Sequence, residues 1–189
     1  GFAPAFATCQ INIEQMHRLA KVAKGHGCQV AGTMLFTLSP VHDDAFWADK
    51  ADKLSALPEV DSLLLYDTGG VLDRERISTL VPAIKANARG KPIEMHSNNM
   101  LGQSAKAYCD AVEFGVTVLH TAARSMANGP SIPSIDCMIK NMEVLGHTHN
   151  IDTSKLEPVS DHFRAVAKAA GYLHDQHYEY DISSLTTQI

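Results

Sequence analysis

Residues 61–66 read Asp-Ser-Leu-Leu-Leu-Tyr and have the clearest strand signature in this sequence of 189 residues. The unbroken run of leucines is typical of a parallel strand that is covered on both faces, because a strand with one wet face alternates apolar and polar residues. The turn sequence Asp-Thr-Gly-Gly follows at 67–70, and a helical pattern begins near residue 73. This part of the chain therefore predicts a strand, a turn and a helix in succession.

The same succession recurs on both sides of this stretch. Strands are expected at 1–10, 29–36, 61–66, 92–96 and 116–120. Helices, marked by apolar residues at every third or fourth position, are expected at 12–24, 41–57, 73–88, 101–114, 135–142 and 161–173. Because strands alternate with helices, the sequence predicts an α/β fold with a parallel sheet.

Composition excludes several classes of function. The formal net charge is -5, with 16 basic and 21 acidic residues, so we expect no nucleic-acid partner and no membrane-surface patch. No apolar run approaches the roughly 18 residues of a membrane span, and no secretion signal is expected. The 4 cysteines form no close pair, which indicates reduced thiols in a cytoplasmic protein.

Polar residues gather where the predicted strands end. The carboxyl ends of parallel strands build the active sites of α/β sheets and barrels, so we expect a site there, although turns after strands are commonly polar in any case. These residues are Thr37, Ser39, Tyr66, Asp67, Thr68, His96, Ser97, Asn98, His120, Thr121 and Arg124.

The triplet His96-Ser97-Asn98 carries the strongest chemical signal. On a strand, His96 and Asn98 share one face together with Glu94. An imidazole nitrogen and an amide oxygen suit a divalent metal, so His96 and Asn98 are the predicted metal ligands. The alternative is an ordinary polar cluster at a strand-to-helix turn. A second pair, His147 and His149, is interpreted as a surface turn.

Four motifs together resemble a known family. They are TLSPVH at 37–42, DTGGVL at 67–72, HSN at 96–98 and SIPS at 131–134. Their order and spacing are similar to the carboxyltransferase branch of the DRE-type metal-dependent lyase barrels. This branch includes the oxaloacetate decarboxylase alpha subunit and the carboxyltransferase domain of pyruvate carboxylase, and hydroxymethylglutaryl-CoA lyase is a more distant member. The resemblance covers most of residues 11–175.

The resemblance implies a (β/α)8 TIM barrel, of which this chain would cover about the fourth to the eighth strand and the C-terminal helices. Residues 1–175 would form this partial catalytic domain, and residues 176–189 an irregular C-terminal extension. A complete barrel needs about 250 residues. The chain is therefore expected to be a fragment, or to associate with the missing barrel half or as a homo-oligomer.

The resemblance also implies a reaction. A divalent metal (zinc, manganese or cobalt) would polarise a small oxo acid or acyl substrate and stabilise an enolate while a carbon–carbon bond breaks or forms. Pyruvate and oxaloacetate are the expected oxo acids, and biotin on a partner domain would carry the carboxyl group. The expected catalytic residues are Tyr66, Asp67 and Ser131, and the expected substrate-binding residues are Thr37, Thr68, Arg124 and Ser134.

Some of these residues admit a second interpretation. Tyr66 is either a general acid or hydrogen-bond donor to an enolate, or a core aromatic side chain. Asp67 either orients His96 or forms the turn that follows the strand. Arg124 either holds a substrate carboxylate or is solvated.

Three positions depart from the family pattern. Tyr66 stands where the family has a carbamylated, metal-binding lysine, Asn98 replaces the second histidine, and Pro130 lies at or near the threonine that exchanges a proton with biotin. Two further hypotheses follow from these departures. One is a catalytically inactive barrel that serves as a structural or regulatory partner of an active subunit. The other is a metal-free lyase or decarboxylase in which Tyr66 is the acid.

Overall fold

A single parallel sheet forms the centre of the computed structural model, which describes residues 12–172, 180 and 182. Its strands are β1 (Ala31–Leu35), β2 (Ser62–Asp67), β3 (Ile93–Ser97) and β4 (Val118–Leu119), paired in that order. The predicted parallel α/β class is therefore confirmed. The strand expected at 1–10 lies outside the described residues, as does the proposed boundary at 175, which stays a prediction.

Helices follow the strands as the apolar periodicity predicts. They are α1 (Ile13–Gly25), α2 (Asp44–Ser55), α3 (Arg74–Asn87), α4 (Ser104–Phe114), α5 (Ile135–Val144) and α6 (Leu156–Ala169), with short 3-10 turns η1 (Arg124–Met126) and η2 (Thr153–Lys155). Asn12, Asp43, Asp73 and Ser134 cap α1, α2, α3 and α5 through side-chain oxygens, which satisfy backbone N–H groups that the helix leaves free.

The helix α6 begins at Leu156, earlier than the predicted start at 161. Pro158 lies in its first turn, where the missing N–H costs nothing, so the proline does not delay the helix. None of the described helices is both long and apolar enough to cross a membrane. The cytoplasmic location stays a prediction.

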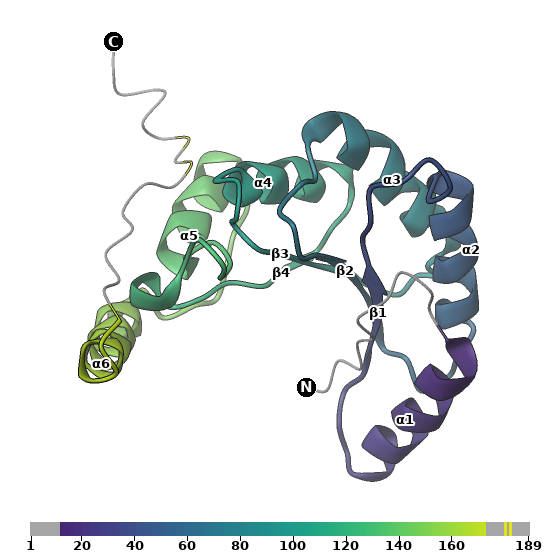
Figure 1. Ribbon diagram of the computed structural model, residues 1–189, viewed down its shortest axis with the longest axis horizontal. Helices are drawn as coiled ribbons and strands as arrows, with labels where there is room; N and C mark the ends of the chain where they lie inside the picture. The colour runs from purple at the N-terminus through teal and green to yellow at the C-terminus, as the bar shows by residue number, and fades with distance from the viewer. Residues whose placement is uncertain (1–11, 173–179, 181, 183–189) are drawn as a thin grey trace.

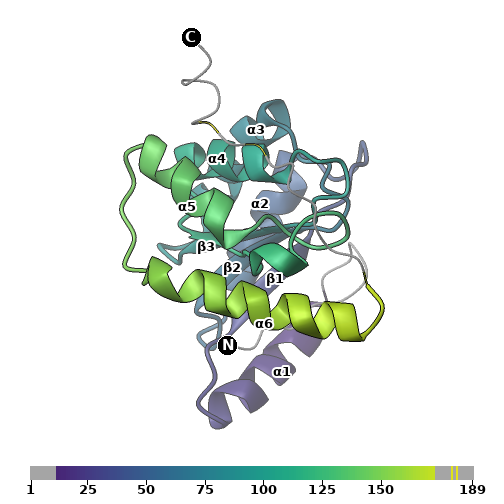
Figure 2. The ribbon, with the colours of Figure 1, turned by 90° about the vertical axis from the view of Figure 1, so that its left-hand side faces the viewer.

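The helices cover one face of the sheet. Figure 1 shows α1 to α5 following an arc around the strands, while α6 lies apart, near the end of the arc. Figure 2, turned by 90°, shows α6 crossing in front of the sheet region. Apolar side chains of the strands, such as Leu63, Leu65 and Met95, are buried in one core with Trp47 and Tyr108 from the helices. A sheet with helices on one curved side is the arrangement of a barrel segment, as the fold prediction requires.

Register decides which side chains share the other face of the sheet. Leu64 pairs with Glu94, and Tyr66 with His96. Since Leu65 and Met95 are in the helix-covered core, their neighbours Leu64, Tyr66, Glu94 and His96 point to the opposite face. We call this the inner face, because it corresponds to the inside of a barrel.

Candidate functional site

Three aromatic rings from adjacent strands meet on the inner face. The ring of His96 lies edge-on to that of Tyr66, with 4.4 Å between the ring centroids, and its Nδ1 is 3.2 Å from Nδ1 of His120. The backbone N–H of His120 donates to the Met95 carbonyl, 3.0 Å away, which holds this residue beside β3. All three side chains are partly exposed, so a ligand on the inner face can reach them.

A continuous chain of polar contacts passes through the two imidazole rings of His96 and His120. His96 Nε2 is 3.1 Å from Asn98 Oδ1, and His120 Nε2 is 2.8 Å from Glu94 Oε2. The Ser62 hydroxyl in turn donates to Glu94. The chain therefore links β2, β3 and the end of β4, and it fixes the orientation of both imidazole rings. We call these five residues the polar chain.

Burial keeps His96 uncharged. Loss of solvent lowers the pKa of His96 from its ordinary value, and the neighbouring His120 lowers it further, while the contact with Asn98 acts in the opposite direction. At neutral pH the His96 ring is therefore neutral, with one nitrogen that donates and one that accepts. The hydroxyl of Tyr66 has no hydrogen-bond partner among the described residues, so it is free to donate to a ligand.

The predicted metal ligands lie together but do not complete a metal site. His96 and Asn98 contact each other, as expected from their spacing. Within the described part of the chain, no group of three His, Cys, Asp or Glu side chains could hold a metal ion. A catalytic metal usually has three protein ligands, and the nearby Glu94 is bound to Ser62 and His120. The described residues thus supply two neutral donors and do not fit a divalent metal by themselves.

Asp67 forms the turn after β2, as one of its two interpretations predicts. Its fully buried carboxylate accepts hydrogen bonds from the N–H groups of Val71 and Leu72, at 3.1 and 3.0 Å, and from the Ser97 hydroxyl at 3.0 Å. This carboxylate lies on the helix-covered side, away from the polar chain. Thr68 is exposed in the same turn.

The turn after β2 holds the backbone of Asn98. Asn98 N–H donates to the Asp67 carbonyl (3.0 Å), and the Ser104 hydroxyl donates to the Asn98 carbonyl (2.8 Å). Gly70 has φ +62°, and a Cβ atom there would lie only 2.1 Å from the Asn98 carbonyl oxygen. Only glycine permits this approach, so the DTGG motif fixes the position of a predicted site residue.

The loop that carries Ser131 is tied to the end of β3. Asn99 N–H donates to the Ser131 carbonyl, and the Asn99 amide donates to Asn128 Oδ1, each at 2.7 Å. Asn99 and Asn128 are both 5% exposed, so these bonds are shielded from water. Ser131 is therefore held beside the end of β3. Ser134 is fully buried and caps α5, accepting from Cys137 N–H at 3.2 Å.

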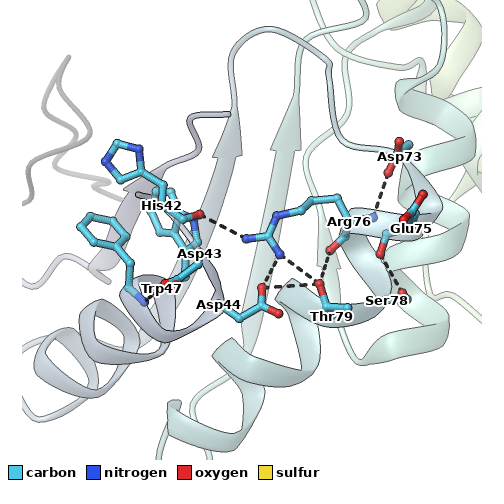
Figure 3. A network of polar contacts seen from close by, with 10 residues as sticks. His42, Asp43, Asp44, Trp47, Asp73, Glu75, Arg76, Ser78 and Thr79 are labelled. Atoms are coloured by element: carbon cyan, nitrogen blue, oxygen red, sulfur yellow. Dashed lines mark hydrogen bonds and ion pairs between the residues drawn. The ribbon is translucent and has the colours of Figure 1, made fainter. Parts of the chain in front are cut away.

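The remaining predicted residues make their contacts elsewhere or belong to the loops that follow the strands. Arg124 pairs with Glu157 of α6. Thr37 begins the loop after β1, which Figure 3 shows fastened by Arg76 of α3. The Arg76 guanidinium pairs with Asp44 and donates to Thr79 Oγ1 (3.0 Å) and to the His42 carbonyl (3.4 Å). Within the described part of the chain, no hydrogen bond joins Thr37, Thr68 or Arg124 to the polar chain.

The His-Thr-His sequence forms a surface turn, as predicted. His147 and His149 are both exposed after α5, and His149 Nε2 lies 3.1 Å from Glu143 Oε1.

Sequence reasoning assigned no catalytic, binding or metal-ligating role to Ser62, Glu94 or His120. Alternation along β3 places Glu94 on the face of His96, and His120 ends the next strand, so both carried a signal. Their mutual contact depends on strand register across 26 residues, which the sequence does not reveal.

Comparison with known proteins identifies relatives among carboxyltransferases. The chain is 31% identical over 151 residues to the methylmalonyl-CoA carboxyltransferase 5S subunit of Propionibacterium freudenreichii subsp. shermanii, covering 79% of this chain and 30% of that protein. It is 27% identical over 157 residues to a pyruvate carboxylase subunit of Methanothermobacter thermautotrophicus, covering 83% of this chain and 27% of the relative. The chain thus spans less than a third of these relatives. No protein-family model matches it.

Solved structures agree on the fold. The carboxyl transferase domain of Rhizobium etli pyruvate carboxylase matches 90% of this chain and 29% of its own, with TM-score 0.78 and 18% sequence identity. The same domain with pyruvate and biocytin also gives TM-score 0.78 and 18% identity, over 90% of this chain and 30% of its own. The partial TIM-barrel prediction is thereby confirmed. Together with the motifs above, these matches confirm that the chain resembles the carboxyltransferase branch of the DRE-type metal-dependent lyase barrels.

Proposed function

We propose that this chain provides part of the oxo-acid site of a carboxyltransferase-type enzyme, which transfers or removes a carboxyl group on a small oxo acid. The observation that carries the proposal is the cluster of Tyr66, His96 and Asn98 on the inner face, near the carboxyl ends of β2 and β3. TIM-barrel enzymes place their active sites at this end of the strands. The names of the relatives, carboxyltransferase and pyruvate carboxylase, support the same reaction class.

The geometry suits a reaction that develops charge on an oxo oxygen. When oxaloacetate loses its C4 carboxylate as carbon dioxide, the C3–C4 bond breaks and its electron pair moves into the enolate, whose oxygen is on C2. Water then returns a proton to C3. The free hydroxyl of Tyr66 would donate to that oxygen. A second donor is His96 Nε2–H, if the oxygen replaces Asn98 Oδ1. Donors placed in advance at a developing oxyanion lower the activation free energy of such a reaction.

The proposal concerns the oxo acid alone. Pro130, at the position where the family carries a proton-exchanging threonine, is exposed and has no hydroxyl. The described residues therefore offer no proton carrier for biotin at this position.

Exchange of the pyruvate methyl protons tests the proposal without biotin. Enolisation in D2O replaces these protons by deuterium, and one-dimensional proton NMR follows the loss of the methyl signal. We expect exchange above the buffer rate, and an exchange rate about 100-fold lower in Tyr66→Phe, because loss of one oxyanion donor costs on that order. His96→Ala should also lower the rate. Tyr172→Phe, which alters an exposed tyrosine, is the matched control.

Two outcomes would contradict the proposal. Bound pyruvate that exchanges no faster than in buffer would show that the site does not form the enolate. Absence of pyruvate binding would favour the inactive-barrel hypothesis. Elemental analysis of the same preparations tests the metal separately, since about one zinc, manganese or cobalt ion per chain, lost in His96→Ala, would overturn the conclusion that these donors do not fit a metal.

A further inference from the structure

A cavity lies on the helix-covered side of the sheet, between α4 and α5. Its volume is about 880 Å³, within the usual size of small-molecule pockets. Apolar side chains from β3, β4 and α5 form its walls, among them Ile93, Leu119, Met138 and Met142. Since Ile93 and Leu119 alternate with Glu94 and His120, the cavity and the polar chain are on opposite faces of the sheet. The cavity is therefore separate from the candidate oxo-acid site.

Two lysines line this cavity, and no carboxylate belongs to its lining. Its lining contains Lys85, Lys91, His147 and His149, but no aspartate or glutamate. This is notable in a chain with 21 acidic and 16 basic residues. An apolar cavity with two lysines and no carboxylate in its lining is complementary to an apolar molecule that carries a negative charge, although Glu143 contacts His149 from outside the lining.

Of the two lysines that line the cavity, Lys85 is the one whose ammonium makes no ion pair or hydrogen bond within the described residues. The Lys91 ammonium already donates to the Leu57 carbonyl, at 2.8 Å, and to the Val60 carbonyl. His149 is paired with Glu143. By contrast, no carboxylate of the described residues lies within ion-pair distance of Lys85. Its side chain passes over Gly115 at the cavity edge, where an added Cβ would be 2.7 Å from Nζ.

We propose that this cavity binds a monocarboxylate with an apolar chain, of the class of medium-chain fatty acids. The chain lies against Ile93, Met138 and Met142, and the carboxylate pairs with the ammonium of Lys85. A lysine ammonium acts as a point charge, which suits one terminal carboxylate, whereas bidentate recognition uses arginine. The proposal does not depend on the proposed oxo-acid chemistry, because it uses neither the polar chain nor the inner face.

Calorimetric titration with octanoate and with 1-octanol tests both parts of the proposal. The two probes share an apolar chain and differ in charge. We expect octanoate to bind the full chain, and Lys85→Met to weaken octanoate binding about fivefold while octanol is unaffected, as for one partly exposed ion pair. Met142→Trp, which fills the cavity, should abolish the binding of both probes. Lys140→Met, which removes an exposed lysine of α5 outside the lining, should change neither.

Three results would overturn the proposal. The first is no octanoate binding to the wild-type chain at millimolar concentration. The second is unchanged octanoate affinity in Lys85→Met, which would show that Lys85 does not bind the carboxylate. The third is unchanged binding in Met142→Trp, which would place the probe elsewhere, such as on the inner face. Far-ultraviolet circular dichroism of each variant establishes that the fold is retained.

Discussion

Replacing Gly70 by alanine tests how the turn after β2 fixes the site. Two costs add at this position. An L-residue in the left-handed region costs about 1–2 kcal/mol, and Gly70 has φ +62°. The new Cβ would also lie 2.1 Å from the Asn98 carbonyl oxygen, so the turn at Gly70 and the backbone of Asn98 must move apart. Overpacking of this kind costs about 1–3 kcal/mol. We therefore expect Gly70→Ala to lower the free energy of unfolding by about 2–5 kcal/mol.

The variant Gly102→Ala measures the cost of the left-handed backbone without the cost of the Cβ contact. Gly102 has φ +75° and belongs to the turn that precedes α4, but nothing lies within 4 Å of a Cβ added there. It should therefore lose only about 1–2 kcal/mol. Urea unfolding at pH 7, followed by circular dichroism, gives both free energies, and equal slopes for the variants would show that they unfold to similar states.

The difference in unfolding free energy between the two variants shows whether the contact with Asn98 restrains the turn. If Gly70→Ala and Gly102→Ala lose the same free energy, the contact with Asn98 does not restrain the turn, and the argument that Gly70 positions Asn98 fails. A larger loss in Gly70→Ala should be accompanied by a shift of the Asn98 side-chain amide resonances in NMR spectra, because its backbone must move.

Three further perturbations test other parts of the fold. Asp67→Ala leaves the N–H groups of Val71 and Leu72 without an acceptor and should cost about 2–6 kcal/mol in urea unfolding, whereas the cap variant Asp73→Ala should cost about 1 kcal/mol. Equal losses would contradict a structural role for the Asp67 carboxylate. The hydrogen bond from the Lys24 ammonium lowers the pKa of Asp61. The stabilisation that ionised Asp61 contributes is therefore present above the ordinary aspartate pKa and is lost as pH falls through the lowered value. The difference in urea midpoint between Asp61→Asn and wild type should be clear at pH 7 and shrink below pH 4, and a constant difference would be inconsistent with this linkage. Arg76→Met should lower the free energy of unfolding by about 1 kcal/mol or less in thermal unfolding, because its ion pair with Asp44 of α2 is partly exposed. A much larger loss would contradict the small contribution expected of a partly exposed ion pair.

Local signals were sufficient to predict most of the elements. The leucine run of β2 and the glycines after α1 and α4 placed strand and helix ends within a few residues. The strand expected at 116–120 is shorter because Gly115, at φ +122°, closes α4, and the Val116 N–H donates back to the Ala111 carbonyl at 3.0 Å. Val116 therefore completes the C-terminal turn of the helix, a bond that apolar periodicity cannot reveal.

The site could be predicted only where its partners are close in sequence. Strand alternation brought His96 and Asn98 together from a spacing of two residues. The contact between Glu94 and His120 instead depends on how α4 returns the chain to the sheet, and so on tertiary packing. For Asp67, both interpretations were consistent with the turn sequence, and the hydrogen bonds from the N–H groups of Val71 and Leu72 favour the turn-forming one.

Two of the three departures from the family pattern lie together on the inner face. Tyr66 is the register partner of His96, and Asn98 contacts the same ring, so both replacements surround the histidine that the chain retains. Each new neighbour is neutral, and burial keeps His96 neutral as well. This part of the inner face therefore offers hydrogen bonds to a reacting carbonyl but no fixed positive charge for a substrate carboxylate. Arg124, the predicted carboxylate ligand, is already paired with Glu157. An oxo acid bound here would consequently be held by its carbonyl through Tyr66 and His96, and its affinity should depend on the carboxylate finding a cation outside this cluster.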